Sequence, residues 1–512
     1  MSRVALTSGA YEAKNIIPSA QACVNLYMEK NPEGSQQPVP TTHYLTPGLT
    51  LLASAPIVDI VRCAYRTTGG YLYTVVGTNV YYVDSNFTFN FLGTIPYART
   101  PVYMSDNGIA LVIVSGGLQG WTINISNSVG SPSIYPTSTP VNAFSTINDP
   151  NFVGLCQTSN GYGATRVDIV DGFFIFNAAG TNAFFKSLVS VSYAQLTSNT
   201  PGSAFNALDY ASKSGQSDPL QSIIAVHDEV VLPGTLTTEI WYNTGASDFT
   251  FGKIQGVFLG HGMVAQYSLS KEGEESAFWL ANDREGRAIF NQYTPYSVKR
   301  ISTHALETIW QTYTNTNDAL SFCYQVNGHA FVDLVFPSAD ATWTYDIVTQ
   351  QWHQKAWADS NGILHRHRAN CAANCYGVNI VGDWQNGNLY SLNPYNYTDN
   401  GNPIVRIRTF PHLMDDEKNV RVTYNQFIAD VQCGTDTNSP DTPQILLSWS
   451  DDRGVTYSNP IWQSMGQQGQ YRTNVSWRRL GMARDRVFKL QWSAPVQTSL
   501  NGAFVDITKH AT

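Results

Sequence analysis

The sequence predicts an all-β protein, a β-propeller of about five to seven blades with an additional β-sandwich-like platform domain. Charged residues make up 13% of the 512 residues and aromatic residues 12%, including 28 Tyr, a balance typical of strands and turns. Short runs of Tyr, Val, Ile and Phe alternate with Gly, Asn, Asp or Ser turns, in blocks that recur at roughly 40 to 60 residues. This pattern changes near residue 400, which indicates a second domain.

Residues 1–55 contain the Pro-, Gln- and Thr-rich stretch "NPEGSQQPVPTTHYLTPGL". Such a composition favours an extended arm over a packed domain. We expect this N-terminal arm to become ordered by packing on the platform domain or on a neighbouring subunit.

Residues 56–402 hold the strand, turn, strand blocks of the predicted propeller. The stretch "TYDIVTQQW", from Thr344 to Trp352, has an aromatic strand end, a turn Asp and a returning Trp at the spacing of kelch-like blades. By contrast, "SVKRISTHALETIWQTY", from Ser297 to Tyr313, predicts a short helix packed outside the sheets. A β-sandwich with long hairpins would give similar local patterns, so that alternative stays open.

Residues 403–512 form the predicted platform domain. Alternating apolar residues around Trp477, Phe488, Leu490 and Trp492 indicate antiparallel strands with one buried face. The sequence near Asn400 reads as a linker into a new series of strands that runs to Thr512, and we interpret this series as a separate β-rich unit.

The octapeptide "SDDRGVTY" in this domain resembles the Asp-box hairpin of sialidase-type propellers, with Ser450, Asp452, Gly454, Thr456 and Tyr457 at the pattern positions. These residue types suit a turn, because the Asp accepts hydrogen bonds from turn amides and Gly adopts a positive φ. The Thr and Tyr are then expected to resume a half-buried strand. Cleaving a sugar would in addition require an Arg cluster and a Tyr nucleophile activated by a Glu, so we favour a structural hairpin.

The sequence contains no phosphate-binding loop, dinucleotide-binding glycine motif, zinc-protease motif or hydrolase serine motif. We therefore predict no catalytic, cofactor-binding or metal residues. The net charge of −8 argues against a protein whose main task is to grip nucleic acid. There is no bilayer-spanning apolar run or signal peptide, and seven scattered Cys do not suggest a disulfide framework, so we expect a protein made in a cytoplasm.

The strongest metal candidate is "HRHRANCAANC", which contains His365, His367, Cys371 and Cys375. Zinc is one hypothesis for these ligand types. Structural zinc sites, however, pair cysteines with a second distant pair, and this spacing differs. We favour a strand and loop with two surface histidines and two ordinary thiols.

Two basic clusters raise the possibility of contact with DNA or an acidic partner. One has Arg366 and Arg368, and the other has Arg478, Arg479, Arg484, Arg486 and Lys489. We favour solvated strand faces that offset acids such as Asp485. The acidic stretches "KEGEES" (Lys271 to Ser276) and "MDDEK" (Met414 to Lys418) are interpreted as exposed turns, with nothing to raise one pKa relative to the other.

Three stretches carry a resemblance to a known family. They are "NIIPSAQACVNLYMEKNPEGSQQPVPTTHYLTPGL", with Asn25, Tyr27, Pro47 and Gly48, then "TTEIWYNTGASDFTFGKIQG", and finally residues 445–496. In this order they resemble the tail hub proteins of short-tailed bacteriophages, also called packaged-DNA stabilisation proteins or tail nozzles. The middle third matches only in its strand pattern.

The resemblance implies a non-enzymatic virion protein, assembled in the host cytoplasm as a hexameric tube of the tail. The tube would lie below the portal and its adaptor, continue the DNA channel, help to retain packaged DNA and conduct it during ejection. Double-stranded DNA would pass through without specific binding. Further implied partners are a tail fibre or tailspike and a tail needle or plug.

Two alternatives from other classes remain. One is a sialidase-like propeller glycosidase, suggested by the Asp box, although several such boxes would be expected and the chain has one good copy. The other is a receptor-binding module that contacts host surface glycans without cleaving them.

Overall fold

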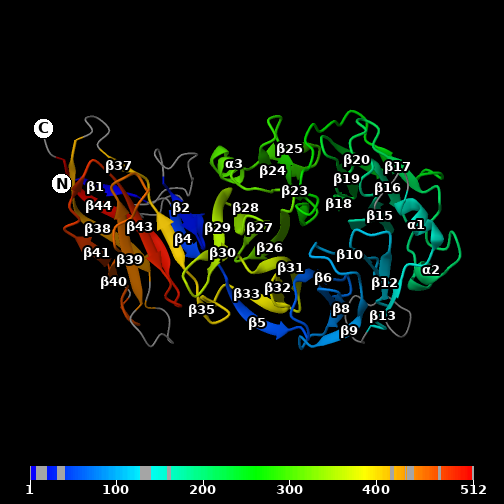
Figure 1. Ribbon diagram of the computed structural model, residues 1–512, viewed down its shortest axis with the longest axis horizontal. Coiled ribbons are helices and arrows are strands. Elements are labelled where there is room, and N and C mark those ends of the chain that lie inside the picture. Colours follow the sequence, from blue (N-terminus) through cyan, green and yellow to red (C-terminus); the bar gives the residue numbers. More distant parts are fainter. Residues whose placement is uncertain are drawn as a thin grey trace.

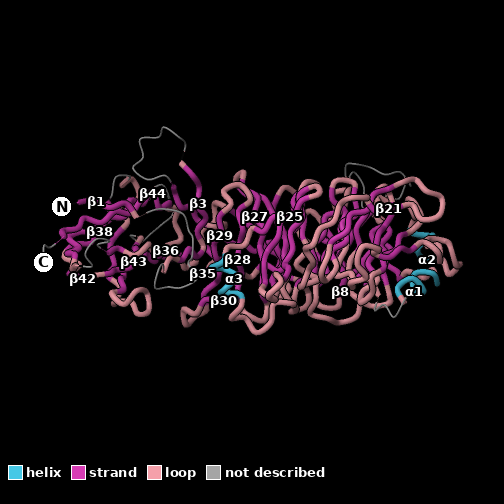
Figure 2. Tube along the Cα trace, turned by 90° about the horizontal axis from the view of Figure 1, so that it is seen from above, coloured by secondary structure: helices cyan, strands magenta, loops and turns pink. Residues whose placement is uncertain are grey.

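Figure 1 shows a computed structural model of an elongated molecule, with a ring of small sheets at one end and a two-layer β-domain at the other. The structure describes residues 2–6, 20–31, 41–126, 140–157, 163–414, 420–432, 434, 443–470 and 474–509. Figure 2 shows strands along the whole length, with the few helices at the margins. The predicted all-β fold is confirmed.

The ring is a β-propeller whose described residues form seven four-stranded antiparallel blades, at the upper end of the predicted range. In six blades the strands follow chain order. They are β6 (Val61–Arg66), β7 (Leu72–Val76), β8 (Asn79–Val83) and β9 (Phe89–Thr94); β10 (Tyr103–Asp106), β11 (Ala110–Val114), β12 (Gly120–Asn124) and β13 (Ala143–Thr146); β14 (Val167–Val170), β15 (Phe173–Asn177), β16 (Ala183–Lys186) and β17 (Tyr210–Ser212); β18 (Ile224–Val226), β19 (Glu229–Pro233), β20 (Thr238–Asn243) and β21 (Phe251–Lys253); β22 (Ser270–Glu272), β23 (Ser276–Asn282), β24 (Ala288–Thr294) and β25 (Ser297–Arg300); β26 (Leu320–Val326), β27 (His329–Phe336), β28 (Ala341–Asp346) and β29 (Gln351–Ala358).

The seventh blade combines strands from both ends of the propeller sequence. It consists of β31 (Ala369–Cys375), β32 (Val378–Asp383), β33 (Asn388–Asn393) and the N-terminal strand β5 (Gly48–Ser54), which pairs with β33. The predicted arm of residues 1–55 therefore needs correction, because its last strand is part of the propeller. This pairing covers the edge of β33 that would otherwise stay open.

Apolar side chains pack between every pair of adjacent blades, and this packing closes the ring. The cluster between the seventh and first blades contains Ile380 and Leu389 together with Val61 and Leu72. The first strands of adjacent blades contact one another and surround the axis. In the hairpin predicted from Thr344 to Trp352, Tyr345 of β28 lies opposite Trp352 of β29, as expected.

The second domain is a sandwich of two mainly antiparallel sheets. One sheet contains β3 (Leu26–Lys30), β4 (Thr41–Leu45), β44 (Ser499–Lys509), β38 (Val422–Gln432) and β41 (Asn474–Arg478), with β1 (Ser2–Ala5) and β42 (Met482–Ala483) at its margins. The other contains β2 (Ala22–Val24), β36 (Arg406–Thr409), β43 (Asp485–Trp492), β39 (Gln444–Ser450) and β40 (Ile461–Ser464), with β37 (Leu413–Met414) on β43. Phe427, Trp477, Phe488 and Trp492 are buried between them, so the predicted alternation is confirmed.

The strands of the arm belong to this sandwich within the same chain. β1 pairs with β44, β3 and β4 pair with each other and β4 with β44, while β2 pairs with β36. Leu6, Cys23 and Leu26 contribute to the same core as the C-terminal strands. The N-terminal segment thus completes the sandwich of its own chain.

One continuous sheet crosses from the propeller to the sandwich. The outer strand β29 of the sixth blade pairs in parallel with β2, and β2 pairs with β36, which gives a sheet of eleven strands. Strands β30 (Leu364–Arg366), β34 (Thr398–Asp399) and β35 (Asn402–Pro403) extend the blade sheets near the same boundary. The two domains are therefore joined by backbone hydrogen bonds as well as by a connecting chain.

Asn25, directly after β2, fixes this junction. Its side chain is 2% exposed and its φ is 56°. Nδ2 donates to the carbonyls of Ala356 and Val405, both at 2.8 Å, and Oδ1 accepts from the Ala356 amide at 2.9 Å. The Asn25 amide donates to the Gln354 carbonyl at 2.8 Å. One amide side chain thereby satisfies backbone groups of both domains where the strand ladder ends.

The described helices are short: α1 (Pro150–Cys156), α2 (Tyr193–Thr197) and α3 (His304–Trp310). The helix predicted from Ser297 to Tyr313 covers too much, because Ser297–Arg300 forms the outer strand of the fifth blade. Thr303 caps α3, and its buried face carries Leu306 and Trp310. Residues 297–300 form a strand despite their helical pattern, because they pair with the edge of β24.

We expect Asn25→Ala to lower the free energy of unfolding by about 2–4 kcal/mol, because buried backbone groups lose partners and Ala is strained at a positive φ. Calorimetry of the full chain should also show the propeller and the sandwich unfolding as two separate transitions, since the junction loses its side-chain hydrogen bonds.

The matched control is Asn400→Ala. Asn400 also has a positive φ, 49°, but its side chain is exposed in the turn between β34 and β35. We expect only the backbone strain there, about 1 kcal/mol. Equal losses for the two variants would show that the Asn25 side chain does not join the domains.

Candidate functional site

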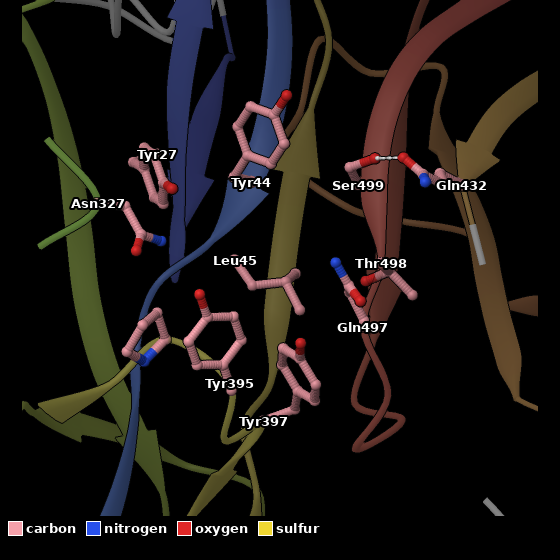
Figure 3. A pocket seen from close by; sticks show the side chains of 11 residues that line it. Tyr27, Tyr44, Leu45, Asn327, Tyr395, Tyr397, Gln432, Gln497, Thr498 and Ser499 are labelled. Carbon is pink, nitrogen blue, oxygen red and sulfur yellow. Dashed lines mark hydrogen bonds between the residues drawn. The ribbon is translucent and has the colours of Figure 1, made fainter. Parts of the chain in front are cut away.

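A groove lies where the propeller meets the sandwich, and Figure 3 shows its side chains converging from both domains. Its cavity volume is about 110 Å³. The strands β3 and β4, the end of β38, the segment that leads into β44 and the turns of the last two blades all contribute to it. The lining residues are Tyr27, Tyr44, Leu45, Asn327, Pro394, Tyr395, Tyr397, Gln432, Gln497, Thr498 and Ser499.

The chemistry of this groove is neutral and aromatic. None of the described lining residues is Asp, Glu, His, Lys or Arg. Burial raises the pKa of Tyr27 and of Tyr44, so both phenols stay protonated near neutral pH. Ser499 Oγ donates to Gln432 Oε1 at 3.2 Å, while Tyr395 is 80% exposed. These groups can hold a neutral polar partner, but they include no acid and base pair for catalysis.

The Asp-box residues begin at Ser450, the last residue of β39, and continue into the long turn that leads to β40. Ser450 Oγ donates to Asp452 Oδ1 at 2.6 Å and accepts from the Gly454 amide at 2.7 Å. The Thr456 amide donates to Asp452 Oδ1 at 2.9 Å. Thr456 Oγ1 donates to Asp452 Oδ2 at 2.5 Å. Both Asp452 oxygens therefore accept hydrogen bonds inside the turn, as the hairpin interpretation predicts.

Two details of this turn go beyond the sequence. Gly454 has a φ of +94°, and a Cβ there would lie 2.6 Å from the Ala20 Cβ, so Gly is required by conformation and by space. Thr456 and Tyr457 do not resume the strand as predicted, because β40 begins at Ile461. Tyr457 instead lies under Lys489, whose Nζ is 4.2 Å from the ring centroid.

The four residues of the metal candidate are separated by the fold. His365 binds Asp340 through Nδ1 at 2.6 Å, which raises the pKa of this histidine. His367 is buried, and burial holds its pKa well below the usual value. Burial likewise raises the pKa of Cys371 to about 12 and that of Cys375 to about 11. Within the described ranges, no three His, Cys, Asp or Glu side chains are grouped as metal ligands.

His367 and the first basic cluster differ from the expected solvated surface. His367 is 8% exposed, whereas a surface histidine was predicted. Arg366 is also buried, with its Cζ 4.0 Å above the Trp384 ring, and Arg368 Nε donates to Asp399 at 2.8 Å. The local sequence could not show this, because the ring that covers Arg366 belongs to Trp384 of the seventh blade.

The second basic cluster divides into two kinds of residue. Arg478, Arg479 and Arg484 are exposed, as the solvated-face interpretation predicts. Arg486 is buried and forms a bidentate pair with Asp451, at 2.6 and 2.8 Å. Asp485 pairs with His412 and Arg453 rather than with its neighbours in sequence.

Of the two acidic stretches, only the first can be compared with the structure. Lys271 Nζ donates to the Ala225 carbonyl and pairs with the exposed Glu274, both at 3.0 Å. Residues 415–419 of the second stretch lie outside the described residues. In the described part of the chain no helix has the length and apolar character needed to cross a membrane.

The role of Asn25 is the main functional feature that residue patterns missed. Asn25 and Ala356 are 331 residues apart, so no local spacing connects them. The only available signal is Asn25 itself, directly after the short apolar run that becomes β2. Tyr395 and Tyr397 were likewise missed, because the other tyrosines of the groove, Tyr27 and Tyr44, lie at the opposite end of the propeller sequence.

Both domains match known protein families. Residues 2–397 match the family described as bacteriophage P22 Gp10, β-propeller, and residues 406–508 match the family described as bacteriophage P22 Gp10, β-sandwich. No curated protein sequence matches the chain.

Among solved structures, the WD40 β-propeller domain of Doa1 is 10% identical with a TM-score of 0.38, covering 67% of this chain and 97% of that chain. The extracellular domain of a hybrid two-component system from B. thetaiotaomicron is 9% identical with a TM-score of 0.39, covering 78% of this chain and 43% of that chain.

The Asp-box turn generates a prediction for acid stability. Hydrogen bonds, first from Ser450 and then from Thr456, lower the pKa of Asp452 to about 2. A carboxylate whose folded pKa is depressed stabilises the protein above its unfolded pKa, about 4, and this contribution disappears as the pH falls towards 2. Asp452→Asn should therefore reduce stability at pH 6 and have progressively less effect between pH 4 and pH 2, as followed by urea unfolding.

Asp228→Asn is the matched control, because Asp228 is an exposed turn residue with a positive φ of 58° and the substitution removes the same charge. We expect no comparable pH-dependent difference for this variant. A loss for Asp452→Asn that does not change with pH would exclude the carboxylate as its cause.

Proposed function

Because the chain belongs to the family of bacteriophage P22 Gp10, a family of phage structural proteins, we propose that it forms part of the wall of a short phage tail. Six copies would form a tube, the hub or nozzle, below the portal and its adaptor. The tube would continue the DNA channel, help to retain the packaged genome and conduct it during ejection. It would be assembled in the host cytoplasm and remain in the virion tail.

The observation that carries this proposal is the match of both domains, in order, over nearly the whole chain. The physical character of the junction supports it. A sheet of eleven strands continues from the sixth blade into the sandwich, so forces applied to one domain pass to the other through backbone hydrogen bonds. A subunit that is assembled once and must withstand internal DNA pressure benefits from such stiffness.

The charge of the chain suggests how DNA would pass. Each chain has a formal net charge of −8. If acidic groups predominate along the lumen of the tube, they repel phosphates and keep the duplex centred. Retention of DNA would then depend on a constriction, or on a needle or plug at the distal end. Double-stranded DNA would not be bound specifically.

A second candidate function is recognition of a host surface glycan by the junction groove. Four tyrosines with amide and hydroxyl groups, and no charged lining residue, suit a neutral polar ligand. A tail fibre or tailspike is an alternative partner for the exposed loops. The glycosidase alternative has less support, because both oxygens of Asp452 accept hydrogen bonds within its own turn.

The decisive experiment measures the native mass of the purified full chain, alone and mixed with the portal and adaptor complex, and images the product by electron microscopy. We expect rings of six, alone or only on the adaptor, with the central hole in line with the portal channel. A portal preparation without adaptor is the control and should recruit no ring.

A stable monomer or dimer that ignores the adaptor would contradict the tail-tube proposal. In that case binding to a neutral glycan array would indicate the receptor-binding alternative, and release of free sugar would indicate the glycosidase. A lumen lined continuously by Lys and Arg in the imaged ring would contradict the acidic-channel mechanism alone.

A further inference from the structure

The propeller contains a cavity on its axis that the tail-tube function does not use. Its volume is about 310 Å³. The lining residues come from the first strands of six of the seven blades, β6, β10, β14, β22, β26 and β31, and from adjoining residues. The cavity is therefore lined by the innermost strands and lies apart from the junction groove.

Two arginines line this cavity without a carboxylate partner. Arg62 is 1% exposed and Arg166 is 8% exposed. Neither forms an ion pair within 4.0 Å in the part of the chain that the structure describes. Buried guanidinium groups are normally paired, since an isolated buried charge is strongly unfavourable. The cavity thus has two arginines at its wall that do not pair with any described carboxylate within 4.0 Å.

Arg62 has hydrogen-bonding capacity left over. Its Nε donates to the Thr100 carbonyl at 2.9 Å, and its Nη1 donates to the carbonyls of Gly77 and Pro96 at 3.0 and 3.2 Å. Nη2 is buried and has no partner. The Oδ1 atom of Asn370, which also lines the cavity, is buried and unpartnered too, while its Nδ2 donates to the Val61 carbonyl.

Arg166 is held at the cavity wall by two contacts. Its Nη1 donates to the Leu269 carbonyl at 2.7 Å, and its Cζ lies 4.0 Å above the ring of Tyr103. Tyr103 is itself stacked on Tyr267, with ring centroids 6.3 Å apart. The guanidinium therefore has a fixed plane, which suits recognition of an oxyanion.

The acids near the cavity do not neutralise these arginines. Asp168, which lines the cavity, accepts hydrogen bonds from the amides of Ile169 and Ala225 and lies 3.9 Å from Lys271. Burial lowers the pKa of Arg62. Asp59 lies beyond ion-pair distance from Arg62 and does not offset this effect. Lys271, also at the cavity wall, is itself paired with Glu274 at 3.0 Å.

We propose that this axial cavity binds one small tetrahedral oxyanion of the phosphate class, held by Arg62 and Arg166. The volume accommodates such an ion together with several ordered waters, each of which takes about 30 Å³ in the liquid. The anion would supply a negative charge for these guanidinium groups and link the first blade to the third, because Arg62 lies on β6 and Arg166 lies directly before β14. It would be a structural component of the propeller, whatever the protein's role in the tail.

The test is thermal unfolding of the dialysed full-length protein in sodium chloride, phosphate, sulfate and acetate at equal ionic strength. At a phosphate concentration one hundred times Kd, we expect the Tm of the propeller to rise by about 3–4 °C. Sulfate should act similarly and acetate weakly. A larger rise in acetate than in phosphate, or no rise in any oxyanion relative to chloride, would overturn the proposal.

Arg166→Gln should abolish the phosphate-dependent rise, and Arg166→Lys should restore part of it. Arg99→Gln is the matched control, because Arg99 is exposed, lies outside the cavity and contacts Tyr97. Arg99→Gln should keep the full rise, and equal responses of the Gln variants would contradict the assignment.

Equilibrium dialysis of the unsubstituted protein with radiolabelled phosphate gives an independent measure of binding. One ion bound per chain supports the site, and clearly less than one contradicts it.

Discussion

The junction formed by β2 and Asn25 is the constraint on which the rest of the architecture depends. Three residues, Ala22–Val24, lie between the outer strand of the sixth blade and the sandwich strand β36. The side chain of Asn25 then satisfies the backbone where the ladder stops. Since β3 and β4 continue from this point into the other sandwich sheet, and β5 into the last blade, the N-terminal segment holds both domains together.

This arrangement couples ring closure to sandwich folding. The seventh blade is complete only when β5 pairs with β33, and the sandwich core is complete only when Leu6, Cys23 and Leu26 are in place. The same short segment therefore removes an open edge from the propeller and fills the core of the second domain. Such coupling suits a subunit whose two domains must keep a fixed orientation in an assembly, and it places the neutral tyrosine groove at the point where they meet.

Residue patterns predicted some of the functional features correctly and others incorrectly. The Asp-box turn was predictable because its hydrogen bonds connect Ser450, Asp452, Gly454 and Thr456, which are within six residues of one another. The cluster from His365 to Cys375 suggested a shared site, but the fold directs His365 to Asp340 and Cys375 to the Gly70 carbonyl. Proximity in sequence did not become proximity of the side chains, because β30 pairs with β29 of the sixth blade whereas β31 belongs to the seventh blade.

The sequence by itself determined the all-β class, the blade-like hairpins such as Thr344 to Trp352, the change of domain near residue 400 and the resemblance to phage tail hub proteins. Each of these depends on local alternation, turn chemistry or ordered motifs. Only the tertiary structure decided that there are seven blades, that β5 closes the ring, and that Asn25, Arg62 and Arg166 occupy buried positions at the junction and the axis. Those features arise from pairings between residues hundreds of positions apart. A strand finds its partner, and a cavity its walls, only when the whole chain has packed and the uncovered edges and faces meet.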